Sequence, residues 1–239
     1  GDILYLVACY DEADAVLRQA LAGARDADLA TQIRLQRKIA NTQRDRYRYD
    51  EALQTLVAAL AVLDWDVTGV RLDAPVQEQP PAVPPDWFAE WLHLHMEMLS
   101  ICYWCGRVDE GIALCDRIQP VVERSGTVGQ QANLMGQRAT LELRRSRYAT
   151  SDQTLALVRN VLAARLEAGP PATIPAAHFQ LGFFLLWHGD DDEAETELQT
   201  SLLRAEETGD LNLQARCLTY LTIFYRRRGL VAETRRNAC

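Results

Sequence analysis

Polar and apolar residues along this chain follow a helical pattern rather than the alternation of strands. Val, Ile and Thr do not cluster in runs that alternate with polar residues, as half-buried strands require. Leu, Ala, Arg, Glu and Gln dominate instead, and these residues lose least on entering a helix. Gly (13) and Pro (9) are sparse among the 239 residues. The pattern therefore predicts an all-α protein.

One short pattern recurs: a small residue or Gly, a spacer, an aromatic or apolar position, then acidic residues and a small residue. Measured at its third position, the copies lie at residues 10, 49, 108, 148, 191 and 231, at intervals of 39, 59, 40, 43 and 40. Each period holds two helices, and the second begins on acidic residues, which suit the positive end of a helix dipole. Small residues just inside the second helix let the two helices approach closely: Ala13, Ala52, Gly111 and Ala194.

The two unequal intervals have local explanations. The interval of 59 contains a 40-residue repeat and about 19 further residues, which match a loop from Val67 to Pro85 with five prolines. Gly126, Gly169 and Gly209 each follow a Leu-, Arg- and Glu-rich stretch, as helix-ending glycines do. N-cap candidates follow two of these glycines, at Thr127 and Asp210. The glycine spacing places three surplus residues of the 43-residue interval in a longer turn near Ala149 to Ser151.

These repeats resemble the tetratricopeptide repeat (TPR). The copy nearest to that pattern contains His178, Leu181, Gly182, Leu185, Gly189, Ala194, Leu198 and Ser201. The resemblance covers the chain outside the proline-rich loop, although a period near 40 departs from the standard 34. It implies a right-handed α-solenoid of about six antiparallel helix pairs, forming a single superhelical domain over residues 1–239.

A finer resemblance concerns the type of protein that carries such repeats. Glu206 to Asp210, leading into Gln214 to Leu218, is similar to the C-terminal superhelices of large bacterial signalling ATPases. These include LuxR-like transcriptional activators and ATPase-linked nucleotide cyclases, in which the superhelix is a sensor or scaffold that gates the ATPase. The chain starts without Met inside a first helix (Ile3 to Cys9) and stops inside a second helix after Leu230. We therefore expect a fragment of a larger bacterial regulator.

Charge and cysteine usage narrow the partners and the compartment. The formal net charge is -8 and the pI about 5.1, so direct nucleic-acid binding by this segment is not expected. The longest apolar run, Leu56 to Leu63, is too short to span a bilayer. Most of the six cysteines lie in apolar helical stretches, where a free Cys acts as a small buried hydrophobe. These features predict a reducing, cytoplasmic setting and no membrane partner.

The TPR resemblance also implies a binding surface. In that family the first helix of each pair lines a concave groove, along which ligand peptides lie. Carried over residue by residue, the groove positions are Arg34, Arg37, Asn41 and Arg44 in the second repeat; His93, Met96, Ser100, Tyr103 and Trp104 in the third; Phe179, Phe183, Leu186 and Trp187 in the fifth; and Arg216, Tyr220, Ile223, Arg226 and Arg227 in the sixth. The expected ligand is a peptide, a protein or a small effector.

Two features of this set indicate how a ligand could bind. The arginine stripe, defined as Arg34, Arg37, Asn41 and Arg44, follows i, i+3, i+7, i+10 spacing and could bind a carboxylate or phosphate. Its alternative is a solvated face. The helix from Ala176 to Trp187 is apolar on nearly every side, which indicates burial all round or a surface awaiting a partner. The partner hypothesis predicts that Phe183→Ala or Trp187→Ala keeps the helical CD signal and abolishes binding, whereas loss of fold would identify these residues as core.

A catalytic or metal site is the weaker alternative. His93, His95, Cys102, Cys105 and Cys115 include a Cys-x-x-Cys spacing, which is known from zinc and redox sites. In the repeat frame, however, His95, Cys102 and Cys115 fall on core positions, filled in the fifth repeat by His178, Leu185 and Leu198. The sequence has no phosphate loop, no dinucleotide motif, no H-E-x-x-H and no G-x-S-x-G, so no cofactor is expected. The sequence thus favours a non-catalytic interaction or sensor module, with an oligomerisation scaffold as its rival.

Overall fold

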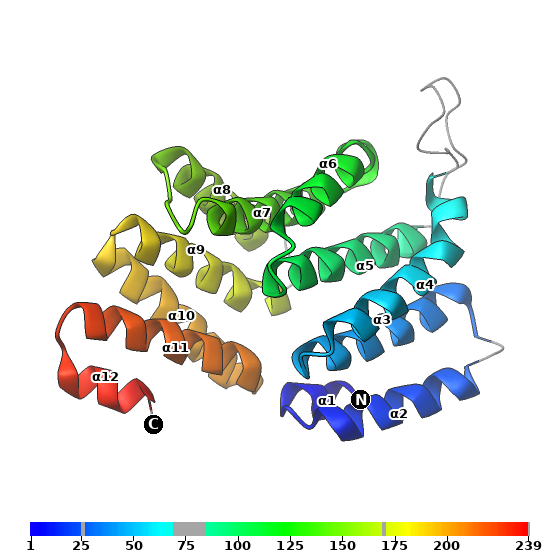
Figure 1. Ribbon diagram of the computed structural model, residues 1–239, viewed down its shortest axis with the longest axis horizontal. Helices are drawn as coiled ribbons and strands as arrows, with labels where there is room; N and C mark the ends of the chain where they lie inside the picture. The colour runs from blue at the N-terminus through cyan, green and yellow to red at the C-terminus, as the bar shows by residue number, and fades with distance from the viewer. Residues whose placement is uncertain (25–26, 69–84, 169–170, 239) are drawn as a thin grey trace. The chain divides into compact units, whose positions relative to one another are not determined.

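All regular structure in the described part of the chain is helical (Figure 1). The computed structural model describes residues 1–24, 27–68, 85–168 and 171–238. Within them lie twelve α-helices and one short 3₁₀ helix, η1 (Pro171–Thr173), and no strand. Most helices that follow each other along the chain pack against each other, as in antiparallel helix pairs. The expected all-α fold of repeated helix pairs is confirmed.

The chain divides into two compact units. Unit 1 comprises Gly1–Tyr5 and Cys9–Arg124, and unit 2 comprises Leu6–Ala8 and Ser125–Cys239. The helices from the N-terminus to the boundary are α1 (Asp2–Leu6), α2 (Tyr10–Gly23), α3 (Leu29–Asp45), α4 (Tyr49–Thr68), α5 (Pro85–Trp104) and α6 (Val108–Ser125). The helices beyond it are α7 (Val128–Arg145), α8 (Asp152–Ala168), α9 (Ile174–His188), α10 (Asp191–Thr208), α11 (Leu211–Arg227) and α12 (Val231–Ala238). A single continuous superhelix over the whole chain stays a prediction.

The repeat frame read from the sequence sets where the second helices begin. Five of them start at the pattern positions: Tyr10, Tyr49, Val108, Asp191 and Val231. The sixth, α8, starts at Asp152, four residues after Tyr148, as the longer turn requires. A left-handed residue stands two positions before each of those five starts: Ala8, Tyr47, Gly106, Gly189 and Gly229. The backbone reverses there, and glycine adopts that conformation without strain.

Helix ends follow the expected capping chemistry. Thr127 forms a full capping box with Gln130 at the start of α7, and the Asp210 carboxylate accepts from the Leu213 amide at 3.0 Å. Gly209 ends α10 in the left-handed conformation. Gly169 and most of the proline-rich loop lie outside the described residues. Helices α4 and α5 take in the two ends of that predicted loop, up to Thr68 and from Pro85.

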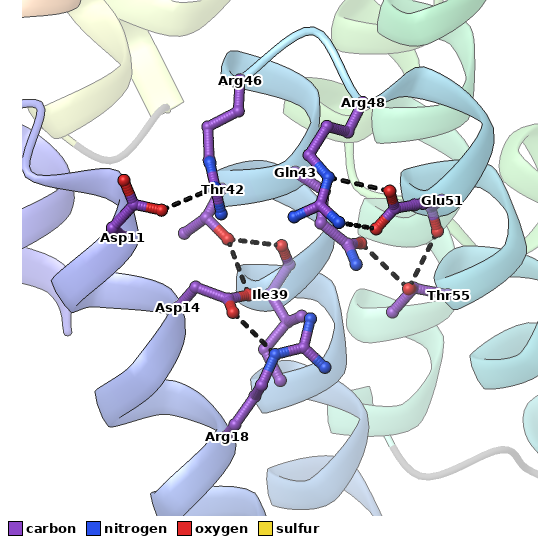
Figure 2. A network of polar contacts seen from close by, with 10 residues as sticks. All are labelled: Asp11, Asp14, Arg18, Ile39, Thr42, Gln43, Arg46, Arg48, Glu51 and Thr55. Atoms are coloured by element: carbon purple, nitrogen blue, oxygen red, sulfur yellow. Dashed lines mark hydrogen bonds and ion pairs between the residues drawn. The ribbon is translucent and has the colours of Figure 1, made fainter.

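In unit 1, polar contacts join α2, α3 and α4 between the apolar layers (Figure 2). The buried Thr42 hydroxyl lies 2.7 Å from the Ile39 carbonyl oxygen and 3.2 Å from the Asp14 carboxylate. On the other side, the Thr55 hydroxyl donates to the Gln43 side-chain oxygen at 2.9 Å. These bonds satisfy polar groups inside the packed layers, which would otherwise be costly to bury.

In unit 2, a glycine sets how closely α9 approaches α10. A Cβ on Gly182 would lie 2.8 Å from Leu198 Cγ and 3.0 Å from the Leu198 backbone nitrogen. Ala194 is also fully buried at this crossing. Of the small residues expected to permit close helix packing, Ala194 lies at this close approach, opposite Gly182.

Candidate functional site

The arginine stripe of α3 contacts carboxylates of α5, the first helix of the next repeat. The Arg34 Nε donates to Glu90 Oε1 at 2.7 Å, and the Arg37 Nε donates to Glu90 Oε2 at 3.0 Å. The Glu90 side chain is only 4% exposed, whereas that of Arg34 is 47% exposed. One buried carboxylate thus bridges two arginines.

Arg44, at the other end of the stripe, is held from three sides. Its guanidinium pairs with Glu97 of α5, and its Nε lies 2.7 Å from Asp45 Oδ1. Its Nη2 donates to the Tyr5 hydroxyl at 2.8 Å, and that hydroxyl donates to Asp45. Burial raises the pKa of Tyr5, so the phenol keeps its proton and donates it. Burial alone would lower the pKa of Arg44, but Glu97, Tyr5 and Asp45 outweigh burial and raise it.

Glu90 and His93 occupy the same face of α5. Burial alone would raise the pKa of Glu90, but the hydrogen bond from Arg34 and the charge of Arg37 outweigh burial, and the pKa lies below 4.5. Partial burial, and then the charge of Arg37, lower the pKa of His93. The side-chain oxygen of Asn41 is buried and has no hydrogen-bond partner among the described residues. The arginine stripe is therefore a charge-paired seam, with its positive charges matched within the chain.

The other positions predicted in the third repeat are spread between surface and core. Tyr103 and Trp104 form an edge-to-face pair with ring centroids 5.2 Å apart, and Trp104 is 43% exposed. Met96 lies in the core at 7% exposure.

Three of the five His and Cys candidates on α5 and α6 are core side chains, namely His95, Cys102 and Cys115, whereas His93 and Cys105 are exposed. His95 is buried, and its Nδ1 lies 2.9 Å from the Trp91 carbonyl oxygen. Cys102 and Cys115 are buried, whereas Cys105 is exposed. Burial raises the pKa of the Cys102 thiol to about 11, which disfavours thiolate chemistry near neutral pH. Within the described ranges, no three His, Cys, Asp or Glu side chains are grouped as metal ligands.

In unit 2, the aromatic residues predicted on α9 pack closely with their neighbours. Phe179 and Phe183 are each 4% exposed and stack with ring centroids 6.0 Å apart. Tyr220 of α11 meets both rings, at 5.6 Å from Phe179 and 4.8 Å from Phe183. Leu186 is fully buried. The two phenylalanines are thus core residues, so Phe183→Ala is no longer expected to leave the fold unaffected.

Half-buried aromatic side chains surround Phe183. Tyr148, from the turn after α7, lies 4.9 Å from Trp187 and 6.1 Å from Phe183, measured between ring centroids. Tyr148, Trp187 and Tyr220 are all partly accessible. We call Tyr148, Phe179, Phe183, Trp187 and Tyr220 the aromatic face.

Arginines of α11 border the aromatic face. The Arg216 guanidinium lies over the Phe179 ring, 4.2 Å from its centroid. Arg227 donates to the Leu186 carbonyl oxygen at 2.8 Å, which satisfies a backbone acceptor in the last turn of α9. Arg226 is exposed. Of the sixth-repeat positions predicted from the sequence, Arg216 and Tyr220 join the aromatic face directly.

The sequence reasoning missed two sets of residues. Glu90 and Glu97 were not paired with the arginine stripe, although their spacing of seven residues on α5 matches Arg37 and Arg44 on α3. Tyr148 was recognised only as a turn residue. In the structure Tyr148 has a positive φ of 66°, and α8 starts four residues after it.

No helix in the described residues is long and apolar enough to cross a membrane. No family model matches the chain, and no curated protein matches its sequence.

Solved structures share the fold. A Rap protein complexed with Competence and Sporulation Factor is 13% identical with a TM-score of 0.62, over 85% of this chain and 52% of that one. PlcR of Bacillus thuringiensis, in complex with the peptide PapR7 and DNA, is 15% identical with a TM-score of 0.57, over 98% and 70%. A kinesin light chain of Podosopora anserina with TPR-like repeats is 14% identical with a TM-score of 0.52, over 88% and 93%.

The present chain spans about half the length of the Rap protein. At these identities the likeness establishes the fold alone: an all-α architecture of TPR-like helical repeats.

Proposed function

We propose that this chain is a non-catalytic recognition module that binds a peptide or a short protein segment on the aromatic face of unit 2. Occupancy of that face would regulate an attached cytoplasmic partner domain, a transcription regulator or a signalling ATPase of a larger bacterial protein. The module itself performs no chemistry in this proposal.

One observation carries the proposal. Three half-buried aromatic side chains surround the buried Phe183: Trp187 of α9, Tyr220 of α11 and Tyr148 of the turn after α7. Tyr and Trp combine a large apolar surface with a polar group, and they anchor many protein interfaces. Because the rings already pack against each other, a ligand would meet a rigid surface and little ordering would oppose binding.

The structural neighbours give independent support. The Rap and PlcR structures are complexes with Competence and Sporulation Factor and with the peptide PapR7, respectively. Two neighbours of this fold are thus seen with a bound factor or peptide, which favours ligand recognition here. The finer assignment, to an ATPase-linked regulator, rests on the sequence resemblance.

Selection from a phage-displayed random peptide library, followed by calorimetry, tests the proposal. Selected peptides should bind the wild-type chain and lose about tenfold in affinity with Tyr220→Leu, which removes one aromatic anchor. Tyr47→Ala in unit 1 is the matched control, because Tyr47 is 80% exposed and should leave affinity unchanged. Failure to select any peptide whose binding depends on Tyr220 would contradict the proposal.

Sedimentation velocity separates the rival function, an oligomerisation scaffold. If the aromatic face serves self-association, the wild-type chain should dimerise with rising concentration and Tyr220→Leu should dissociate the dimer. A recognition module predicts that the same variant leaves sedimentation unchanged.

A further inference from the structure

The indole nitrogen of Trp187 is a buried hydrogen-bond donor without an acceptor. Trp187 lies in the last turn of α9, and its side chain as a whole is half-buried. Its Nε1, however, is buried and has no hydrogen-bond partner among the described residues. An indole N–H can only donate, and a buried donor that makes no hydrogen bond lowers stability. The aromatic face therefore contains a polar group that the described part of the chain leaves unsatisfied.

Two aromatic rings hold the indole in this position. The Trp187 ring lies 4.9 Å from that of Tyr148, measured between centroids, with an interplanar angle of 36°. It meets the Phe183 ring edge to face, with centroids 6.3 Å apart. These ring contacts stabilise the indole through its apolar surface, and they leave its N–H unused.

A change of side-chain rotamer can bring this N–H to the surface. Trp187 is partly accessible, so one side of the indole already borders solvent. Rotation about its two side-chain bonds leaves α9 intact, and a helix allows more than one χ1 well for aromatic residues. A ligand that offers an acceptor at the surface favours the rotated state, because the donor is paired only in that state.

The surroundings of Trp187 favour a neutral acceptor. Helix α9 has no Asp, Glu, Lys or Arg, and Arg216, which borders the aromatic face, already lies over the Phe179 ring. A carboxylate beside the indole would lose part of its hydration among uncharged rings, which is costly. A main-chain carbonyl is neutral. In an extended segment it is free to accept, whereas in a helix most carbonyls already accept a hydrogen bond within the helix.

We propose, on the basis of the recognition role above, that Trp187 anchors the bound segment by donating its indole N–H to a main-chain carbonyl oxygen of that segment. The indole rotates outward when the segment binds. Apolar side chains of the segment then pack on Tyr148, Tyr220 and the uncovered edge of Phe183. Because every residue of a peptide has this carbonyl group, Trp187 fixes the position of an extended segment rather than selecting one side chain.

Calorimetry and NMR with a synthetic octapeptide test this role. The probe is the tightest binder from an array of random linear octapeptides, selected with the whole chain. Trp187→Phe keeps an aromatic ring and removes the N–H, so it should weaken binding of that octapeptide about tenfold. In the wild-type chain, the indole N–H resonance of Trp187 should move downfield when the octapeptide is added, as a new hydrogen bond requires.

A thioamide scan of the same octapeptide identifies the acceptor. Each carbonyl oxygen in turn is replaced by sulfur, which is a weaker acceptor. One replacement should weaken binding to wild type about tenfold and leave binding to Trp187→Phe within about twofold, which is the coupling expected of two groups in contact. Trp104→Phe is the matched control: Trp104 is 43% exposed and lies in unit 1, so this variant should bind the octapeptide within about twofold of wild type.

The outcomes separate the anchor from the recognition role. Octapeptides that depend on Tyr220 but bind Trp187→Phe as tightly as wild type would overturn the anchor and leave recognition by the aromatic face standing. The anchor would also be wrong if the Trp187 resonance did not move in the wild-type chain, a measurement that does not depend on how the variant folds. An array without sequence-dependent binding would overturn the recognition role itself.

Discussion

Arginines on the first helices of the repeats face different side chains in the two units. In unit 1, Arg34, Arg37 and Arg44 of α3 face the carboxylates Glu90 and Glu97 of α5, so each positive charge is matched by the following repeat. In unit 2, the helix beside the arginines of α7 and α11 is α9, which has no charged Asp, Glu, Lys or Arg at all. The same repeat position thus faces carboxylates of the next repeat in one unit and an uncharged, aromatic helix in the other.

The contribution of an arginine to the stability of a helical repeat depends on what its side chain contacts. An arginine whose partner lies on the next repeat stabilises the stack, because removing it leaves a buried carboxylate uncompensated. An arginine stacked on an aromatic ring beside an uncharged helix contributes less to stability. Stability measurements on matched variants therefore separate the two kinds of arginine.

The largest effect is expected at Arg44. Arg44→Ala leaves Glu97 and Asp45 without their shared cation and removes a donor to Tyr5, which should lower the free energy of unfolding by about 3 to 5 kcal/mol. Urea denaturation followed by CD measures this. Arg34→Ala is the control and should cost less than about 1 kcal/mol, because its side chain is 47% exposed and Arg37 still pairs with Glu90. Equal losses of unfolding free energy in Arg44→Ala and Arg34→Ala would contradict a buried set of ion pairs between α3 and α5.

A second large effect is expected in the core beneath the aromatic face. Phe183→Ala removes a ring that is 4% exposed and contacts Tyr148, Trp187 and Tyr220, so it should cost about 3 kcal/mol. Leu203→Ala on α10, at 56% exposure, should cost less than about 0.5 kcal/mol. If Phe183→Ala were as mild as Leu203→Ala, the ring would be a surface anchor, as the sequence first suggested.

The repeat frame could be predicted because its signals are local. Turn residues, N-caps and acidic helix starts lie within a few positions of each other, and they located five second helices and the longer turn before α8. The identity of the core positions followed as well, since Cys102 and Cys115 are buried as their repeat equivalents Leu185 and Leu198 are.

The contacts between repeats could not be predicted in the same way. The pairing of Arg44 with Glu97 joins residues 53 positions apart across a loop of irregular length, so no periodic signal aligns them. Phe183 looked available to a ligand because its own helix offers no cover. Its cover comes from Tyr148 and Tyr220, which reach it from other elements.

A smaller, pH-dependent effect is expected at Glu90. Its pKa lies below 4.5 in the folded chain, so its contribution to stability is complete above that value and is lost as the pH falls through the folded pKa. Glu90→Gln should therefore be about 1 to 2 kcal/mol less stable than wild type near pH 7, and the difference should narrow at acid pH. Urea midpoints at a series of pH values measure this.

Glu142→Gln is the control for that series. Glu142 pairs with Arg138 on its own helix and is 41% exposed, so the variant should cost less than about 0.5 kcal/mol throughout. If the stability difference between Glu90→Gln and wild type stayed constant from neutral to acid pH, the contribution of Glu90 to stability would not require an ionised carboxylate.

The smallest effect on stability is expected at Arg216, and it tests the comparison most directly. Arg216→Gln removes the guanidinium that lies over the Phe179 ring, and loss of a cation–π contact should cost about 1 kcal/mol. Arg44→Gln should cost several times more, about 3 kcal/mol, because it leaves Glu97 and Asp45 without their shared cation. Urea denaturation of both variants measures the difference. A destabilisation by Arg216→Gln as large as that by Arg44→Gln would show that arginines in both units hold the fold together, and that the contrast between them does not exist.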